Sequence, residues 1–154
     1  MTKTNVMKIL EQKKIKYEFF EYDSNITDGV EVAKTLGEKP VQVFKTLVTT
    51  DSQNHYFVFV IPVCNTLDLK GVAKIVNKKS IDMIKQKELF PLTGYIHGGC
   101  SPIGMKKKFM TYFDESINNF EEIYVSAGKV GVQIKINTKD LISLTDGYIG
   151  SLVL

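Results

Sequence analysis

Residues 41–63 read VQVFKTLVTTDSQNHYFVFVIPV, and this stretch decides the class of fold to expect. Residues 41–50 are rich in β-branched and aromatic side chains, and residues 56–63 are nearly all apolar, so both segments are typical of strands. Between them, residues 51–54 (Asp-Ser-Gln-Asn) have the composition of a turn. The stretch therefore predicts a β-hairpin near the middle of the chain.

Helices and strands flank this hairpin without strict alternation. Apolar residues at helical spacing, a cap at Thr4 and a stop at Gly37 predict helices over residues 2–14 and 27–37. Further short helices are expected over residues 69–75, 80–87 and 138–144, and strands over residues 17–22, 95–96, 110–113, 122–126 and 131–136. This order favours one α+β domain over residues 1–154, with a mixed, strongly twisted, partly barrel-like β-sheet flanked by short helices.

Length and composition agree with a single globular domain. The chain has 154 residues, of which 44% are hydrophobic and 24% charged, so disordered and collagen-like chains are excluded. No apolar run reaches the roughly 18 residues of a membrane-spanning helix, and residues 1–16 lack the apolar core of a signal peptide. We therefore expect a cytoplasmic protein without a membrane partner.

The positive charge is concentrated in one part of the chain. All 20 basic residues are lysines, and residues 69–108 carry nine of them with two acidic residues, a net charge of +7. Such a segment can attract phosphates without reading a base sequence, although a solvated lysine-rich face is the alternative. Because arginine is absent, phosphate contacts would come from ammonium groups or from backbone N–H groups.

The sequence contains no recognisable pattern for a metal site or for a catalytic nucleophile. His55 and His97 are isolated, with no second ligand at a metal-binding spacing, so neither a metal nor a cofactor is expected. The two cysteines, Cys64 and Cys100, have no CxxC spacing. Cys100 lies in a glycine-rich loop whose amides could lower its pKa, but no general base stands at a recognisable spacing from it.

Lys45 is unusual for its place in a strand. The period-2 alternation of a strand puts it on the same face as Val43 and Leu47. An ammonium among aliphatic side chains is costly unless an anion or a polar partner meets it. The alternative is a lysine that extends its charged end to water at a sheet edge.

A glycine-rich stretch is the second unusual feature. Residues 93–104 read TGYIHGGCSPIG and precede the lysines at 106–108. Glycines let the backbone approach a ligand closely and present N–H groups to it, and the lysines would add attraction for phosphate. Residues 125–131 (VSAGKVG) form another stretch of small residues, which is more typical of a hairpin turn than of a site.

Together these segments resemble the YbaK/EbsC-type Cys-tRNA(Pro) deacylases, whose fold is shared with the editing domain of bacterial prolyl-tRNA synthetases. The resemblance rests on residues 44–48 (FKTLV), 67–70 (LDLK), 94–107 and 125–129 (VSAGK), in that order, and covers nearly the whole chain. Its most specific part is the stretch that fits the pattern TGYxxGGxSPxGxKK.

The resemblance implies roles for individual residues. Lys45 would be the catalytic residue, in contact with the 3′-terminal nucleotide and the aminoacyl ester. The substrate-binding positions would lie on the pocket wall, on the glycine loop beside the amino acid, and on the turn that completes the pocket: Tyr22, Thr46, Gly98, Gly99, Ser101, Gly104, Ser126 and Gly128.

The implied activity is removal of cysteine from mischarged Cys-tRNA(Pro), and by extension from Cys-tRNA(Cys), without a cofactor. In this family the substrate's own thiol is proposed to attack the ester, which gives a cyclic thiolactone and free tRNA. The expected partners are the acceptor end of tRNA and prolyl-tRNA synthetase, rather than DNA. Alternatives are hydrolysis by a bound water, acting on another small amino acid, or a non-catalytic module that binds the acceptor end or the synthetase.

Two positions depart from the family pattern. Gln133 stands where close relatives often have an aspartate, and Asp28 stands where some have an aromatic residue. Both departures bear on which amino acid the pocket accepts, so the sequence leaves the substrate preference open.

Overall fold

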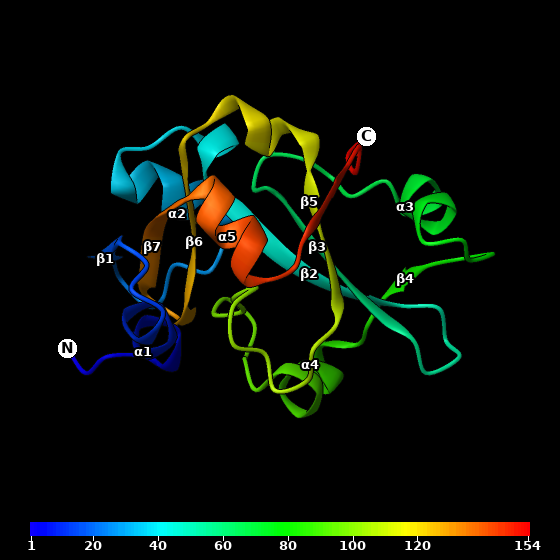
Figure 1. The fold of residues 1–154 in the computed structure, drawn as a ribbon, viewed down its shortest axis with the longest axis horizontal. Helices are drawn as coiled ribbons and strands as arrows, with labels where there is room; N and C mark the ends of the chain where they lie inside the picture. Colours follow the sequence, from blue (N-terminus) through cyan, green and yellow to red (C-terminus); the bar gives the residue numbers. More distant parts are fainter.

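The computed structural model describes residues 1–154 as two β-sheets with short helices around them (Figure 1). The expected hairpin is confirmed: β2 (Phe44–Thr50) pairs antiparallel with β3 (Tyr56–Pro62) along its whole length. β5 (Met110–Asp114) and β8 (Tyr148–Gly150) continue this sheet in parallel, and β4 (Asp82–Met83) pairs antiparallel with the end of β2. The five-stranded sheet thus has the order β4-β2-β3-β5-β8.

The smaller sheet is wholly antiparallel. It consists of β1 (Tyr17–Glu21), β7 (Val132–Asn137) and β6 (Glu122–Lys129), in the order β1-β7-β6. A single parallel bridge, between Val43 and Tyr124, joins it to the larger sheet. The α+β class with mixed sheets and flanking helices is therefore confirmed, and the two sheets do not close into a barrel.

Short helices cover the sheets. The N-terminal helix begins as its sequence indicates, because the side chain of Thr4 accepts a hydrogen bond from the Met7 N–H, and α2 ends at Gly37 in a left-handed conformation. None of the helices could reach across a lipid bilayer. The helices and 3-10 turns are α1 (Asn5–Gln12), α2 (Gly29–Leu36), η1 (Pro40–Gln42), α3 (Leu69–Ile75), α4 (Gln86–Thr93), η2 (Glu115–Asn119) and α5 (Thr138–Leu144).

The prediction of a helix over residues 80–87 is wrong. Residues 82–83 form β4, and α4 begins only at Gln86, where Glu88 accepts a hydrogen bond from the Lys85 N–H at 2.9 Å. The edge of β2 offers unpaired backbone groups there, and β4 satisfies them; pairing of this kind overrides a weak helical pattern. Residues 95–96 are likewise not a strand.

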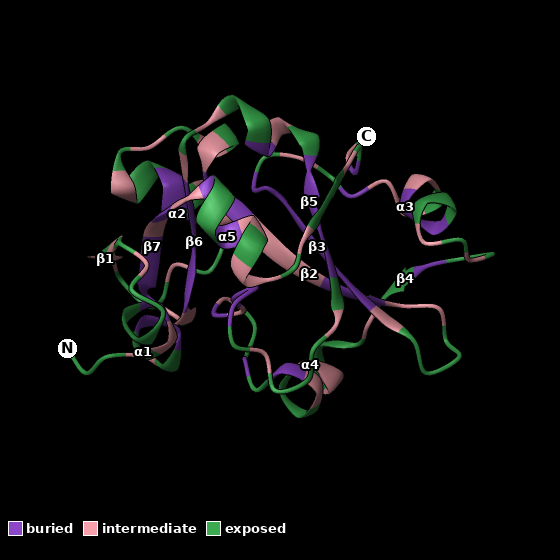
Figure 2. Cartoon of the chain, viewed as in Figure 1, coloured by how far each residue is buried: buried purple, intermediate pink, exposed green.

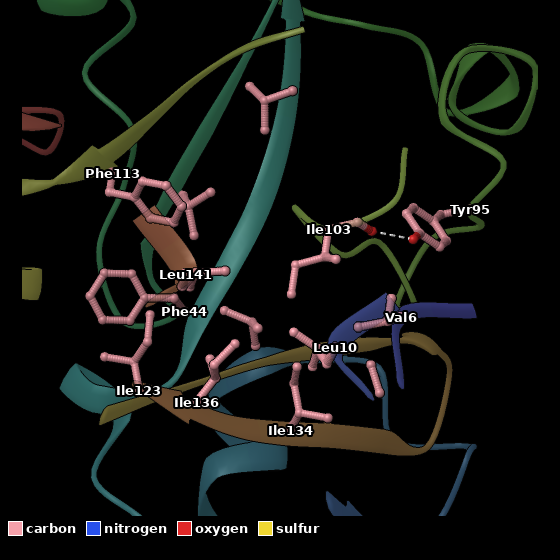
Figure 3. Close-up of a cluster of buried hydrophobic side chains, with 14 of the residues drawn as sticks. Val6, Leu10, Phe44, Tyr95, Ile103, Phe113, Ile123, Ile134, Ile136 and Leu141 are labelled. Carbon is pink, nitrogen blue, oxygen red and sulfur yellow. Dashed lines mark hydrogen bonds between the residues drawn. The ribbon is translucent and has the colours of Figure 1, made fainter. Parts of the chain in front are cut away.

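One core is shared by both sheets. Eighteen buried residues form it, and the buried faces of the central strands and helices point into it (Figure 2). Figure 3 shows Phe44 from β2 beside Ile123 and Ile136 from the smaller sheet, with Val6 and Leu10 of α1 close by. The Tyr95 hydroxyl donates a hydrogen bond to the Ile103 carbonyl and so fixes the glycine loop against this core.

Two smaller clusters complete the interior. One packs α3 against the other face of the five-stranded sheet, and the second packs α2 against the outer face of the three-stranded sheet. The second cluster includes Val43 and Tyr124, the two residues that bridge the sheets. Residues on α2, β2 and β6 are therefore brought together where the two sheets meet.

Candidate functional site

A cavity of about 440 Å³ lies at this meeting point. It is lined from β2, from the start of α2, from the glycine loop and from β6. Four of the predicted site residues line it together, namely Lys45, Thr46, Gly98 and Ser126. The other lining residues are Thr27, Asp28, Gly29, Phe44, Leu47, Val63, Leu89, His97 and Cys100.

The cavity lies along an unpaired edge of β2. This strand pairs with β4 only at Thr49 and Thr50, so its edge is uncovered beside the cavity. The Val63 N–H donates to the Val43 carbonyl at 2.8 Å, so Val43 bonds toward β3. Because hydrogen-bonding direction alternates along an antiparallel strand, the N–H and carbonyl of Thr46 face away from β3, toward the cavity.

Lys45 brings positive charge to the cavity without a counter-ion. Its side chain is half-buried, and it takes part in none of the ion pairs of the structure. Asp28 lines the same cavity, but its carboxylate accepts a hydrogen bond from the Glu31 N–H at 3.2 Å and so caps α2. A half-buried ammonium that forms no ion pair is suited to hold an anionic or strongly polar ligand.

Buried polar atoms without partners lie at the same place. The Thr46 hydroxyl is buried and has no hydrogen-bond partner. The side-chain oxygen of Gln133 is likewise buried and without a partner. Ser126, which lines the cavity, pairs with Gln133 across β6 and β7, and its hydroxyl accepts from the Gly128 N–H at 3.1 Å. Because an unpaired buried polar group costs about 1–3 kcal/mol, a ligand that satisfied the Thr46 hydroxyl would be favoured.

The chemistry offered by the cavity argues against a thiol nucleophile. Cys100 lines the cavity, but burial raises the pKa of its thiol to about 12. His97 lines the cavity from an exposed position, and no hydrogen bond joins it to Cys100. Besides the Asp28 carboxylate and the His97 ring, the cavity offers a cation, backbone groups and three hydroxyls, those of Thr27, Thr46 and Ser126. This set can orient a substrate and stabilise developing negative charge.

Five predicted residues do not line the cavity. Gly104 and Gly128 both have positive φ and both lie against the Tyr95 ring, so they hold the glycine loop and the β6 turn in place. Ser101 is fully buried, and its hydroxyl accepts from the Ile103 N–H at 3.3 Å.

The other two lie near the turn that follows β6. A Cβ on Gly99 would come within 2.9 Å of the backbone nitrogen of Val130, so only glycine fits that contact. The backbone N–H of Tyr22 donates to the Gly131 carbonyl at 2.9 Å. These residues shape the walls behind the cavity.

The family resemblance placed Asp28 at the pocket, but its neighbours Thr27 and Gly29 and the contribution of α4 were not predicted. Thr27 and Gly29 reach it because α2 packs its first turn against Val63, at the end of β3. Leu89 comes from α4, which lies on the opposite side. The family resemblance points to position 28 alone, and no local pattern indicates that Thr27, Gly29 and Leu89 line the same cavity.

The model of the aminoacyl-tRNA editing domain family matches residues 23–144. A protein of Enterococcus faecalis, named "Putative Cys-tRNA(Pro)/Cys-tRNA(Cys) deacylase EbsC", is 44% identical over 147 residues, which are 94% of this chain and 90% of that protein.

Solved structures agree on the fold. A structure described as that of a "putative trans-editing enzyme for prolyl tRNA synthetase" superimposes with a TM-score of 0.86 at 24% identity, covering 97% of this chain and 94% of that one. The hypothetical protein APE2540 gives a TM-score of 0.89 at 18% identity, covering 97% of this chain and 99% of that one.

Proposed function

The chain belongs to the aminoacyl-tRNA editing domain family, and on this premise we propose that it is a trans-acting deacylase that removes cysteine from mischarged Cys-tRNA(Pro). The name of its Enterococcus faecalis relative supports Cys-tRNA(Pro) and Cys-tRNA(Cys) as substrates. An enzyme of this kind works on the tRNA pool of the cytoplasm, and prolyl-tRNA synthetase is the partner whose errors it would correct.

The observation that carries this proposal is the Lys45 ammonium, held without a counter-ion beside the open edge of β2. A 3′-terminal aminoacyl ester brings polar and anionic groups to such a place. Lys45 would hold the end of the tRNA and stabilise the oxygen that gains negative charge when the ester is attacked. The N–H groups of the glycine loop at Gly98 would add to this stabilisation.

The attack itself is assigned to the substrate. The sulfur of the esterified cysteine attacks its own carbonyl carbon, the bond from that carbon to the ribose oxygen breaks, and the thiol proton passes to this oxygen. The products are a cyclic thiolactone and free tRNA. The raised pKa of Cys100 supports this assignment, because the protein's own thiol in the cavity is protonated at neutral pH.

Hydrolysis by a bound water is the second candidate. The unpartnered hydroxyl of Thr46 supports it, because a rotation of this cavity-lining side chain would bring the buried hydroxyl to a water molecule beside the ester. The two routes differ in their demand on the substrate. Thiol attack needs cysteine, whereas an activated water would also release serine or alanine, which would make the protein a deacylase of broader range.

Replacement of Lys45 tests the proposed site. Lys45→Ala should fold normally and lose roughly 10²–10³ of the deacylation rate on Cys-tRNA(Pro), as expected for removal of one group that stabilises an oxyanion. Lys129→Ala is the matched control, because Lys129 is exposed and does not line the cavity. Wild-type turnover of Lys45→Ala would contradict the proposed role.

The choice of route is tested on charged tRNAs. Ser-tRNA(Pro) and Ala-tRNA(Pro) should react far more slowly than Cys-tRNA(Pro) if the substrate's thiol attacks. Equal rates on the three would identify a bound water as the nucleophile. If the folded protein deacylates none of the three charged tRNAs, the non-catalytic binding module would be favoured.

A further inference from the structure

Two large apolar side chains beside the cavity are exposed to solvent. Phe90 is 60% exposed and Ile96 is 58% exposed, the highest values among large hydrophobic residues apart from the C-terminal Leu154. Each directly neighbours a residue that lines the cavity, Leu89 in one case and His97 in the other. Exposed large apolar side chains next to a site are typical of a surface that binds a ligand.

The backbone around these side chains is held in place. On α4, Leu89 turns toward the cavity, and Phe90, one residue further, turns outward to the face that also carries Lys87. Gly94 ends the helix in a left-handed conformation, and the buried Tyr95 is fixed through its hydroxyl to Ile103. Ile96 therefore projects from an anchored turn, so the two apolar groups are presented on a rigid support.

The charge around them is positive. Lys85, Lys87 and Lys106 are exposed and take part in no ion pair. Lys106 is tied to the end of α4, because its backbone N–H donates to the Thr93 carbonyl at 2.9 Å. The one acid on the helix, Glu88, accepts a hydrogen bond from the Lys85 N–H.

An aromatic side chain with lysines around it suits an unpaired nucleic-acid strand. Bases stack on such a side chain whatever their identity, and the lysines neutralise the phosphates between them. We propose that Phe90 and Ile96 form a platform on which the unpaired nucleotides preceding the 3′-terminal one stack, with Lys87 and Lys106 beside their phosphates. This inference rests on the proposed function, because it takes the aminoacyl end of a tRNA to be the ligand of the cavity.

Binding of a short oligonucleotide tests the platform without any catalysis. The probe is a short single-stranded RNA with the 3′ end CCA, in which the fluorescent base 2-aminopurine replaces the cytosine next to the terminal adenosine. Its fluorescence should fall when the base stacks on the wild-type protein. Phe90→Ala should weaken binding roughly tenfold and remove most of this quenching, and Phe90→Trp should restore both. Phe19→Ala is the control, because Phe19 is 48% exposed but lies on β1, outside the cavity.

Kinetics give a second measurement. Phe90→Ala should raise KM for Cys-tRNA(Pro) about tenfold and leave kcat unchanged, because the platform binds the strand and does not touch the reacting ester. On the 3′-cysteinyl ester of adenosine, which lacks the preceding nucleotides, Phe90→Ala and wild type should react equally.

The outcomes separate this inference from the proposed function. Unchanged binding and quenching in Phe90→Ala would overturn the platform, even if the wild-type protein deacylates Cys-tRNA(Pro). A wild-type protein that deacylates nothing, but binds the oligonucleotide in a Phe90-dependent way, would overturn the proposed reaction and keep the platform. A shift from dimer to monomer in Phe90→Ala, with binding unchanged, would assign the patch to contact between two copies of the chain.

Discussion

The two cysteines differ in how far their thiol groups are buried. Burial raises the pKa of Cys100 to about 12, whereas Cys64 is exposed at the end of β3. At pH 8 only about one Cys100 side chain in ten thousand is a thiolate, and the thiolate is the reactive form.

Alkylation should therefore be selective. Iodoacetamide at pH 8 should modify Cys64 and spare Cys100 in the folded protein, and peptide mass spectrometry would show which thiol reacted. The Cys64→Ser, Cys100→Ser double variant should keep its deacylase activity, because neither thiol is assigned a role. A folded Cys100→Ser variant without activity would instead identify an enzyme nucleophile.

Glycines at positive φ differ in what surrounds them. A Cβ on Gly128 would come within 2.9 Å of a Val6 methyl and 3.0 Å of the Tyr95 ring, whereas a Cβ on Gly37 would meet nothing within 4 Å. Gly37→Ala should cost about 1–2 kcal/mol of unfolding free energy for its left-handed backbone alone. Gly128→Ala should cost a further ~1–3 kcal/mol for overpacking, measured by urea denaturation. Equal losses of unfolding free energy in the two variants would show that Val6 and Tyr95 move aside to accommodate the added methyl group.

The sequence predicted individual residues of the site better than it predicted their surroundings. The apolar strand face of Lys45 and the glycines of the loop are local signals, and Lys45, Thr46 and Gly98 do line one cavity. The unpaired backbone edge beside Thr46 depends on where β4 ends along β2, a long-range contact that no local pattern encodes.

At the scale of elements, the tip of the β2–β3 hairpin is organised around one carboxylate. The Asp51 side chain is only 4% exposed; it accepts hydrogen bonds from the backbone of Gln53 and His55, from the His55 ring at 2.7 Å, and pairs with Lys78 at 3.3 Å. Burial alone would raise the pKa of Asp51, but these hydrogen bonds outweigh it and hold the pKa far below its ordinary value.

This depression makes the hairpin tip sensitive to acid. A carboxyl group whose pKa is lower in the folded state stabilises the protein above its unfolded pKa of about 3.9, and this contribution is lost as the pH falls toward the folded value. Asp51→Asn should therefore lower the thermal midpoint at pH 7, by less at pH 3, and by progressively less as the pH falls further toward the folded value. Glu121→Gln, at an exposed position without side-chain hydrogen bonds, is the control. An equal loss at both pH values would contradict the assignment.

Elements with strong local signals were predicted correctly, and those created by pairing were not. The capped helices α1, α2 and α5 and the long hairpin follow from periodicity and caps. β4 and β8 are short strands of two and three residues, too short for any periodicity. They exist because neighbouring strands leave hydrogen-bonding edges for them.

For the whole molecule, the uneven distribution of charge matters most. Of the nine lysines in residues 69–108, Lys78 pairs with Asp51 and Lys108 with Asp146, and seven take part in no ion pair. These seven are available to phosphates, and the contacts of lysines with phosphates release counter-ions.

Affinity for tRNA should consequently depend on salt and little on the anticodon. Two or three phosphate contacts would weaken binding roughly tenfold between 50 and 200 mM salt, which a titration of uncharged tRNA would measure. A tRNA with another anticodon and the same acceptor stem should bind equally well. A flat salt profile would leave the lysines as a solvated face.

A single bridge joins the two sheets, but the hydrophobic core does not divide between them. Phe44 and Val60 of one sheet pack in the same cluster as Val125 and Ile134 of the other. Neither sheet can open without exposing the apolar surface of its neighbour. The chain should therefore unfold as one cooperative unit, and in native-state hydrogen exchange the amides of β3 and β7 should share one opening free energy.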